Sequence, residues 1–520
     1  MVNVLITALL LLNAIPEGTD VPQLREDNIH EVISAMTDEE KCTLIVGGRA
    51  KSFNGIGHTN TGVPGAASVI NGIPRLGIPT VVLADGPAGL RISPTREGDP
   101  RTFYCTGYPI ATMLSSTWNL DLVEEAGRNM GNEVLEYGVD ILLAPGANIH
   151  RNPLCGRNFE YYSEDPLLTG KMAAAMINGI ESNGVGTSLK HFAVNNQEYN
   201  RLSNDAIVSE RALREIYLRN FEIAVKESQP WTIMTSYNFI NGEHAAESPR
   251  LLTDILRGEW GFEGAVMTDW GGGYDDAAIV RAGNEMIQPG TDERYINLLT
   301  AIKDGSLSRE AVDRAVERIL QLVVKTPKFK GYKPSEAPDL KEHAKVCKKI
   351  ADEGVVMLKN EGAALPVSTD QEIALFGVTS YDFIAGGTGS GNVNRPYVVD
   401  LMSGLSNSGF RLEPDCFMQI DGGDTFSRES DLLVSNVCDG VRMLYERPSV
   451  ASLHVLKRLF CNRVCLSYKV LSCFVKSREK FVNALHVCPF LHLDSKIRKI
   501  SQIYALVRIY ALVRILPCVV

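Results

Sequence analysis

The chain has 520 residues, of which 45% are hydrophobic and 22% charged, a composition typical of a folded protein with two or more domains. Its formal net charge of −10 argues against a general nucleic-acid-binding protein. The charge is unevenly spread, because residues 421–520 carry 15 basic and 8 acidic side chains, a net of +7. The first 420 residues are therefore strongly acidic.

An apolar run, VLITALLLLNAI, occupies residues 4–15. The run is too short to cross a membrane comfortably, and its position favours a signal peptide over residues 1–18. The run lacks a preceding basic residue and a good cleavage site, so a buried or frayed first helix is the alternative. The first interpretation predicts a secreted or periplasmic protein, and the second a cytoplasmic one. No membrane partner is expected, since no later stretch is long and charge-free enough to span a bilayer.

Residues 27–326 alternate short apolar runs with amphipathic stretches. Strands separated by helices indicate parallel pairing, and roughly 300 residues of such alternation fit a closed (β/α)8 TIM-type barrel. The predicted strands are VVLA (81–84), DILLAP (140–145), TSLKHFAV (187–194), WTIMTSY (231–237) and GAVMTD (264–269). Helical patterns lie at residues 120–138, 163–184, 209–228, 248–260 and 308–326.

A stretch rich in Pro and Lys, residues 327–340, is predicted to be a linker. A second α/β unit follows at residues 341–418. It contains a helix and a turn at 341–362, a strand at 372–377, and a helix at 398–409 that ends at glycine.

Residues 419–520 have a different composition. No glycine occurs from residue 441 to residue 520, although the chain contains 45, and IYALVR occurs twice in tandem at 503–508 and 509–514. Because turns need glycine, a folded α/β segment of this length without any would be unusual. We expect an aberrant, poorly structured tail from a frameshifted or misassembled coding end. An unusual helical extension is the alternative.

Neither cysteine nor glycine patterns indicate a metal or cofactor. Five of the 11 cysteines lie before residue 421, scattered without CxxC or the histidine spacing of a zinc site. The GGTGSGNVN stretch (386–394) lacks the GK[ST] of a phosphate-binding loop. No metal and no organic cofactor is predicted.

Polar side chains stand where the predicted strands end, which is the edge that carries the active site in a β/α barrel. Carboxylates such as Asp85 and donors such as Lys190 are the groups that bind sugar hydroxyls. Nearby cations should lower the pKa of Asp269 and keep it ionised, so that it can attack an anomeric carbon. The candidate side chains at this edge are Asp85, Arg157, Lys190, His191, Tyr237, Asp269 and Trp270.

Six local patterns stand out in chain order: LADGPAGLR (83–91), GRNFEYYSEDP (156–166), KHFAVNNQE (190–198), SERALREIYLRNFE (209–222), MTSYNFING (234–242) and VMTDWGG (266–272). Together they resemble glycoside hydrolase family 3, whose order they keep over roughly residues 28–415. The GGTGSGNVN stretch also resembles a loop of the family's second domain. The resemblance implies an α/β protein with a (β/α)8 TIM-type barrel followed by an incomplete α/β sandwich domain.

The resemblance also implies roles for individual residues. Asp269 would be the catalytic nucleophile, with Tyr237 near it and Trp270 on the aglycone side. Arg211 is a weaker supporting candidate. The AVNNQE after KHF and the Asp85-Gly-Pro sequence look like β-glucosidases, which implies a β-linked glucoside or gluco-oligosaccharide as substrate. The glycone hydroxyls would be held by Asp85, Arg157, Lys190 and His191.

The chain departs from the family at its second carboxyl group. Retaining hydrolysis usually needs an acid that protonates the leaving oxygen, and family glucosidases take it from a loop of the second domain. The resemblance fades at about residue 418, before that loop. Because Glu429, Glu446 and Glu479 lie in the tail in no matching context, no acid/base is assigned and impaired hydrolysis is expected.

Every candidate except Asp85 has a structural alternative. Asp269 would then cap a helix, and Arg157 would simply pair with Glu160 or Asp165. The remaining side chains would be core or ion-pair residues, namely Lys190, His191, Tyr237 and Trp270. For the whole protein, the alternatives are a sugar-binding protein without turnover and a Schiff-base lyase that uses Lys190. The sequence does not fix the oligomeric state.

Overall fold

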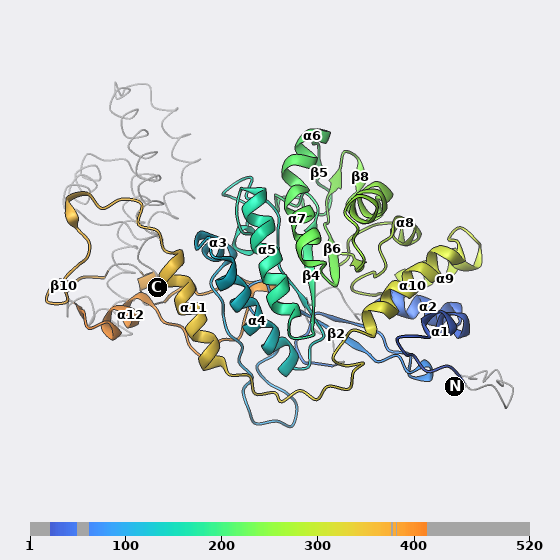
Figure 1. The fold of residues 1–520 in the computed structure, drawn as a ribbon, viewed down its shortest axis with the longest axis horizontal. Coiled ribbons are helices and arrows are strands. Elements are labelled where there is room, and N and C mark those ends of the chain that lie inside the picture. The colour runs from blue at the N-terminus through green and yellow to red at the C-terminus, as the bar shows by residue number, and fades with distance from the viewer. Residues whose placement is uncertain (1–20, 49–61, 376–377, 381, 413–520) are drawn as a thin grey trace, which may run out of the picture. The chain divides into compact units, whose positions relative to one another are not determined.

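The described part of the computed structural model falls into two compact units (Figure 1). The first runs to Val355 and takes in Gly386–Pro396, and the second holds Val356–Ala385 and the segment from Tyr397. The signal peptide expected at residues 1–18 and the tail expected at 419–520 lie outside the described residues. The structure describes residues 21–48, 62–375, 378–380 and 382–412.

A six-stranded sheet forms the centre of the first unit, in the order β1-β2-β3-β4-β6-β9. Neighbouring strands are parallel except β1 and β2, which pair antiparallel with Ser68 opposite Leu83. The parallel pairing expected of the predicted strands is confirmed, and β1, which was not predicted, adds an antiparallel pair. The strands are β1 (Ser68–Ile70), β2 (Val81–Asp85), β3 (Ile141–Leu143), β4 (Gly186–Phe192), β6 (Thr232–Thr235) and β9 (Ala265–Met267).

Two further extended segments close this sheet on itself. Met286 pairs with Met267 of β9, and the next residue, Ile287, pairs with Val46; both bridges are parallel. Two residues beyond Val46, the amide of Gly48 donates to the carbonyl of Val69 in β1 at 2.9 Å. The six strands and these two segments complete the ring, which confirms the TIM-type barrel expected from the sequence.

Helices cover the outside of the barrel because their apolar stripes pack on strands that are buried on both faces. Figure 1 shows α4, α5 and α7 standing beside β4 and β6. Side chains cap several helix starts, as Asn119 does for α4 and Ser308 for α10. The α-helices described in the first unit are α1 (Ile29–Ala35), α2 (Asp38–Ile45), α3 (Ala111–Ser116), α4 (Leu120–Glu136), α5 (Pro166–Glu181), α6 (Glu210–Ala212), α7 (Arg219–Ser228), α8 (Asp276–Ala282), α9 (Asp292–Lys303), α10 (Arg309–Val323) and α11 (Leu340–Gly354), and the helix expected at 248–260 is the π-helix η5 (Arg250–Glu259).

The first unit extends past the linker expected at residues 327–340. Helix α11 buries Val346 in the barrel's hydrophobic core. Its His343 lies with Nδ1 2.7 Å from Oε1 of Glu133 in α4, and both side chains are buried. The boundary between the compact units consequently falls near Val355, after α11 rather than before it.

The described part of the second unit is small. A parallel pair of strands and one helix follow each other in the order expected of an α/β fold. The strand expected at 372–377 and the helix expected at 398–409 are both present in shorter form. The elements are β10 (Glu372–Ile373), α12 (Leu401–Asn407) and β11 (Arg411–Leu412).

A search of the described helices finds none that is both long and apolar enough to cross a membrane. The cysteines within the described ranges are free: Cys42 and Cys105 are buried, and Cys155 and Cys347 are half-buried. A small three-stranded sheet of β5 (Asp205–Ala206), β7 (Phe239–Ile240) and β8 (Glu243–His244) lies among the loops that follow β4 and β6.

Asp140 makes the stability of the barrel depend on pH. Its carboxylate is buried and accepts hydrogen bonds from the amides of Val82 at 2.9 Å and Lys328 at 3.1 Å. Burial raises the pKa of Asp140 from 3.8 to about 6, although both hydrogen bonds oppose the rise. The folded state therefore binds the proton more tightly than the unfolded state. Asp140's contribution to stability is complete below pH 3.8 and is lost as the pH rises through 6.

We expect the free energy of unfolding of the wild type, measured relative to Asp140→Asn, to fall by about 2 to 3 kcal/mol between pH 4 and pH 7, because each pKa unit is worth about 1.4 kcal/mol. Urea unfolding of both proteins at each pH measures this difference. Asp254→Asn, at an exposed position, is the matched control and should show no such trend. A difference that stays constant with pH would contradict the role of Asp140.

Candidate active site

Asp269 lies just beyond β9, at the C-terminal edge of the barrel, with only 7% of its surface exposed. Its Oδ1 accepts a hydrogen bond from the amide of Trp270 at 2.7 Å. Its Oδ2 has no hydrogen-bond partner among the described residues. A buried carboxylate oxygen without a partner is costly, so it calls for a functional explanation. Asp269 caps no helix, because the next helix, α8, is capped by Asp275.

His191 faces this carboxylate from the end of β4. Its Nε2 is 3.7 Å from Oδ2 of Asp269, and its Nδ1 is 3.1 Å from the hydroxyl of Tyr161. Asn148 holds the backbone of His191 on both sides, accepting from its amide at 2.8 Å and donating to its carbonyl at 2.9 Å. Burial, with the charge of Arg157, holds the pKa of His191 well below its usual value. The imidazole is therefore neutral.

Arg157 and Lys190 supply the positive charge around Asp269. Arg157 donates hydrogen bonds to the carboxylate of Glu160 from Nη2 at 2.8 and 3.0 Å and from Nε at 3.2 Å. The Arg157–Glu160 ion pair that the sequence offered as an alternative is therefore present. Burial acts to raise the pKa of Glu160, but Arg157 and Lys190 more than offset it, and the pKa is lowered. Glu160 is therefore ionised. The side chain of Lys190 is buried, with 2% of its surface exposed.

The pKa of Asp269 is shifted in the direction opposite to the expected one. Burial raises it above 3.8, and the charges of Arg157 and Lys190 offset this rise only in part. The sequence showed the cations but not the depth of the site, so the predicted lowering is wrong. The enclosed carboxyl still has two cations near it, which limit the rise.

Tyr237 and Trp270 form one wall beside Asp269. The hydroxyl of Tyr237 donates to the backbone carbonyl of Trp270 at 3.1 Å. The guanidinium of Arg201 lies over the Tyr237 ring, 4.9 Å from its centre. Tyr237 is buried and Trp270 is half-buried, so the indole is partly open to a ligand.

Asp85 ends β2 at the same edge of the barrel. The strand is buried along its whole length, and the carboxylate accepts from Nη1 of Arg91 at 3.1 Å. β2 pairs with β3, and β3 with β4, the strand that carries Lys190 and His191. The barrel therefore brings the predicted strand-end residues to one edge.

Residues 386–396 return to the barrel and lie against the segment that holds Arg157. The hydroxyl of Ser390 donates to Oε1 of Glu160 at 2.9 Å. A Cβ atom added to Gly387 or Gly391 would fall within 2.8 Å of the Phe159 ring, so only glycine permits this close approach. The glycine-rich stretch is thus a strap packed on the candidate site.

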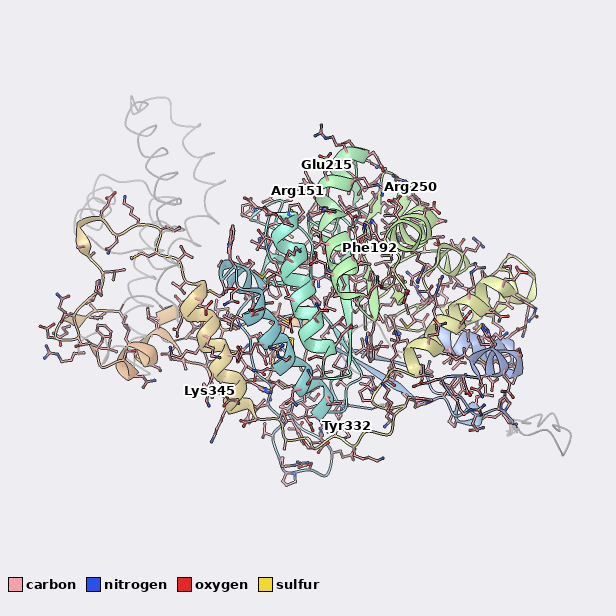
Figure 2. The ribbon with its side chains drawn as sticks, in the orientation of Figure 1. Arg151, Phe192, Glu215, Arg250, Tyr332 and Lys345 are labelled. Carbon is pink, nitrogen blue, oxygen red and sulfur yellow. The ribbon has the colours of Figure 1, made fainter. Side chains whose placement is uncertain are left out.

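Sequence reasoning missed the supporting roles of Arg91, Arg201 and Ser390. Arg91 ends the LADGPAGLR pattern and Ser390 lies in GGTGSG, so the patterns were visible, whereas the contacts require the fold. Arg211 is 84% exposed and pairs with Glu215 at 3.1 Å, which overturns its suggested supporting role. Figure 2 shows Glu215 at the periphery of the barrel unit.

A cavity elsewhere in the barrel and a search for metal ligands bear on other possible sites. A cavity of about 750 Å³ opens at the opposite end of the barrel, where its walls include Trp231 and Ala265 at the starts of β6 and β9. Within the described ranges, no cluster of three or more His, Cys, Asp or Glu side chains is arranged to hold a metal ion.

Comparison with protein families places the barrel among glycosidases. Residues 66–322 match the model of the glycosyl hydrolase family 3 N terminal domain. The chain is 39% identical over 418 residues to beta-glucosidase B of Emericella nidulans, covering 79% of this chain and 46% of the relative. It is also 39% identical over 402 residues to an exo-alpha-(1->6)-L-arabinopyranosidase of Bifidobacterium longum, covering 74% of this chain and 50% of the relative.

Among solved structures, beta-glucosidase 3B from Thermotoga neapolitana in complex with glucose is similar with a TM-score of 0.74 and 48% sequence identity. The match covers 78% of this chain and 57% of that chain. The chain thus spans about half the length of the curated relatives.

Proposed function

Because residues 66–322 belong to glycoside hydrolase family 3, we propose that the chain is a retaining glycoside hydrolase that releases terminal β-D-glucosyl residues from β-glucosides, with impaired hydrolysis of poor leaving groups. The beta-glucosidase relatives support the glycone, and the arabinopyranosidase relative shows that family membership alone does not fix it. The observation that carries the proposal is the buried Asp269 carboxylate, whose Oδ2 has no hydrogen-bond partner among the described residues and whose pKa the charges of Arg157 and Lys190 act to lower against its burial.

In the proposed first step, Oδ2 of Asp269 attacks the anomeric carbon. A bond forms between that carbon and the carboxylate, and the bond to the leaving oxygen breaks. Lys190 and Arg157 donate hydrogen bonds to the glycone hydroxyls, and Asp85 accepts from them. His191 is neutral, so one of its ring nitrogens can form a hydrogen bond with a glycone hydroxyl. It carries no extra proton that it could give to Asp269. Water then attacks the same carbon, the ester bond to Asp269 breaks to regenerate the carboxylate, and the proton of the water passes to the solvent.

We infer the impairment from the described carboxyl groups Glu160, Glu198 and Asp85. An acid catalyst must hold a proton near neutral pH, but the pKa of Glu160 is lowered. Glu198 is paired with Arg201 at 2.9 Å, and Asp85 with Arg91 at 3.1 Å. We infer that none of these acts as an efficient acid. The tail residues Glu429, Glu446 and Glu479 lie outside the described residues.

A sugar-binding protein without turnover is the second candidate. The arrangement of hydroxyl-binding side chains around Asp269 favours it, together with the lack of a suitable acid among the carboxyl groups paired above. Such a protein would bind glucose measurably in calorimetry and release no product from any glucoside.

Proton NMR of the first product from 2,4-dinitrophenyl β-glucoside tests the proposal, because this leaving group departs without protonation. The proposal predicts that β-glucose forms first and then mutarotates to the α anomer. First release of α-glucose would show an inverting mechanism and contradict the role of Asp269. Glucose binding without any release of dinitrophenolate would favour the binding protein.

A further inference from the structure

Three apolar side chains form an exposed surface beside the candidate site, which we call the aromatic shelf: Leu202, Phe239 and Tyr274. Leu202 is 56% exposed and Tyr274 66% exposed. The Tyr274 and Phe239 rings stack with their centres 5.8 Å apart and an angle of 20° between them. The Tyr274 hydroxyl donates to the carbonyl of Leu202 at 2.8 Å. Contiguous exposed apolar side chains of this kind mark binding surfaces.

The aromatic shelf is continuous with the site around Asp269. Arg201, the neighbour of Leu202, lies over the Tyr237 ring, and the Tyr237 hydroxyl donates to the carbonyl of Trp270. These contacts lead from the buried side chains around Asp269 to the exposed apolar surface. Since the glycone site is enclosed, a leaving group attached to the anomeric carbon must extend toward an open side such as this one.

The loop that carries Tyr274 is held in place. Nη2 of Arg294 donates to three successive carbonyls, those of Gly271 and Gly272 at 3.2 Å and Gly273 at 2.9 Å. Oε1 of Glu247 accepts from the amides of Tyr274 and the residue after it. A ring fixed in this way loses little freedom when a ligand stacks on it.

We propose that the aromatic shelf binds the pyranose ring of a gluco-oligosaccharide leaving group, with Tyr274 as the specificity-determining residue. The inference rests on the proposed function and names the leaving group that the function takes. A pyranose presents a flat face of C–H bonds to an aromatic ring and hydroxyls at its edge. Oε1 of Glu198 is buried without a partner among the described residues, and its carboxylate is paired with Arg201 beside the shelf, so it can accept a hydrogen bond from such a hydroxyl.

Reactivation of a trapped enzyme tests the shelf without needing an acid catalyst. 2-Deoxy-2-fluoro-β-glucosyl fluoride places a fluoroglucosyl group on Asp269 and releases fluoride, which is too small to reach the shelf. An acceptor hydroxyl then attacks the anomeric carbon, the ester bond to Asp269 breaks, and the hydroxyl proton passes to the buffer. The rate at which hydrolysis of β-glucosyl fluoride returns, measured against acceptor concentration, reports acceptor binding.

With cellobiose as acceptor, Tyr274→Ala should raise the half-saturating concentration about tenfold, as expected for loss of a stacking ring. Tyr274→Phe is the matched control, because it keeps the ring and removes only the hydrogen bond to Leu202. It should change the value less than twofold. Equal half-saturation in wild type and Tyr274→Ala would overturn the proposal.

Two further outcomes of the reactivation experiment separate the shelf proposal from an aryl-binding site and from a failure of the proposed function. A Tyr274→Ala effect with benzyl β-glucoside but none with cellobiose would overturn the sugar assignment in favour of an aryl group. If the fluoride traps no enzyme, the proposed function fails, and calorimetry then tests the shelf by itself. In that case wild type should bind cellobiose more tightly than glucose, and Tyr274→Ala should lose the difference. A difference that persists in Tyr274→Ala would overturn the shelf.

Discussion

Replacing Asp269 with asparagine should lower kcat/KM for 2,4-dinitrophenyl β-glucoside by on the order of 10⁴-fold or more, as removal of a covalent nucleophile does in other enzymes. The amide has nearly the same shape, and its oxygen can still accept from the Trp270 amide. It cannot form the glycosyl ester. Initial rates of dinitrophenolate release, with circular dichroism to check folding, measure the effect.

Asp275→Asn is the matched control for this substitution. Asp275 lies in the same loop region and caps α8, but its side chain is exposed and belongs to no part of the proposed site. It should retain kcat/KM within about threefold. Retention of activity in Asp269→Asn would show that the nucleophile lies elsewhere.

The second large effect concerns the leaving group. A chain without an efficient acid should lose about 10² to 10⁴-fold more rate on alkyl glucosides than on dinitrophenyl glucosides, relative to a glycosidase that has its acid. A series of aryl β-glucosides should therefore show kcat/KM that falls steeply as the pKa of the leaving phenol rises. The rate on the dinitrophenyl substrate should also stay level above neutral pH, because no essential acid loses its proton there.

A shallow dependence on the leaving group, with a fall in rate at alkaline pH, would show that an acid is present after all. Glu160→Gln then separates two sources. If Glu160 is that acid, the substitution slows only substrates with poor leaving groups. If the acid comes from outside the described residues, Glu160→Gln affects all substrates alike through the loss of the Arg157 and Ser390 contacts.

The strands that the sequence revealed are those buried on both faces. β2 is a continuous apolar run ended by Asp85, and β4 is buried at every position although it contains Thr, Ser, Lys and His. The segments that close the barrel at Val46–Gly48 and Met286–Gln288 make only single bridges, and β1 has three residues. Segments that make single bridges carry no periodicity, so the closing strands were not predictable, and nothing in the sequence of β1 marks its reversed direction.

The boundary between the two compact units was not predictable from the sequence for a different reason. Pro and Lys at 327–340 are typical of a linker, and the sequence pattern ends the barrel there. Helix α11 nevertheless packs on the barrel through Val346 and a buried contact between His343 and Glu133. The apolar stripe of α11 was visible, but which unit it covers depends on tertiary contacts.

In the site, the identities of the polar residues were predictable and their electrostatics were not. Polar residues at strand ends gather at one edge by topology, which places Lys190, His191 and Asp269 together. The direction of the pKa shift of Asp269 depends on how completely the fold excludes water, which one sequence does not reveal. The contact from Ser390 to Glu160 spans 230 residues of chain and has no local signal.

The most direct test of the central claim is the intact mass of the protein after incubation with 2,4-dinitrophenyl 2-deoxy-2-fluoro-β-glucoside, followed by mapping of the labelled peptide. The leaving group needs no acid, and the fluorine slows hydrolysis of the intermediate. A single fluoroglucosyl adduct on Asp269, absent from Asp269→Asn, is the predicted result. No adduct on protein that circular dichroism shows to be folded, or an adduct on another residue, would contradict the claim that Asp269 is the nucleophile of an assembled glycosidase site.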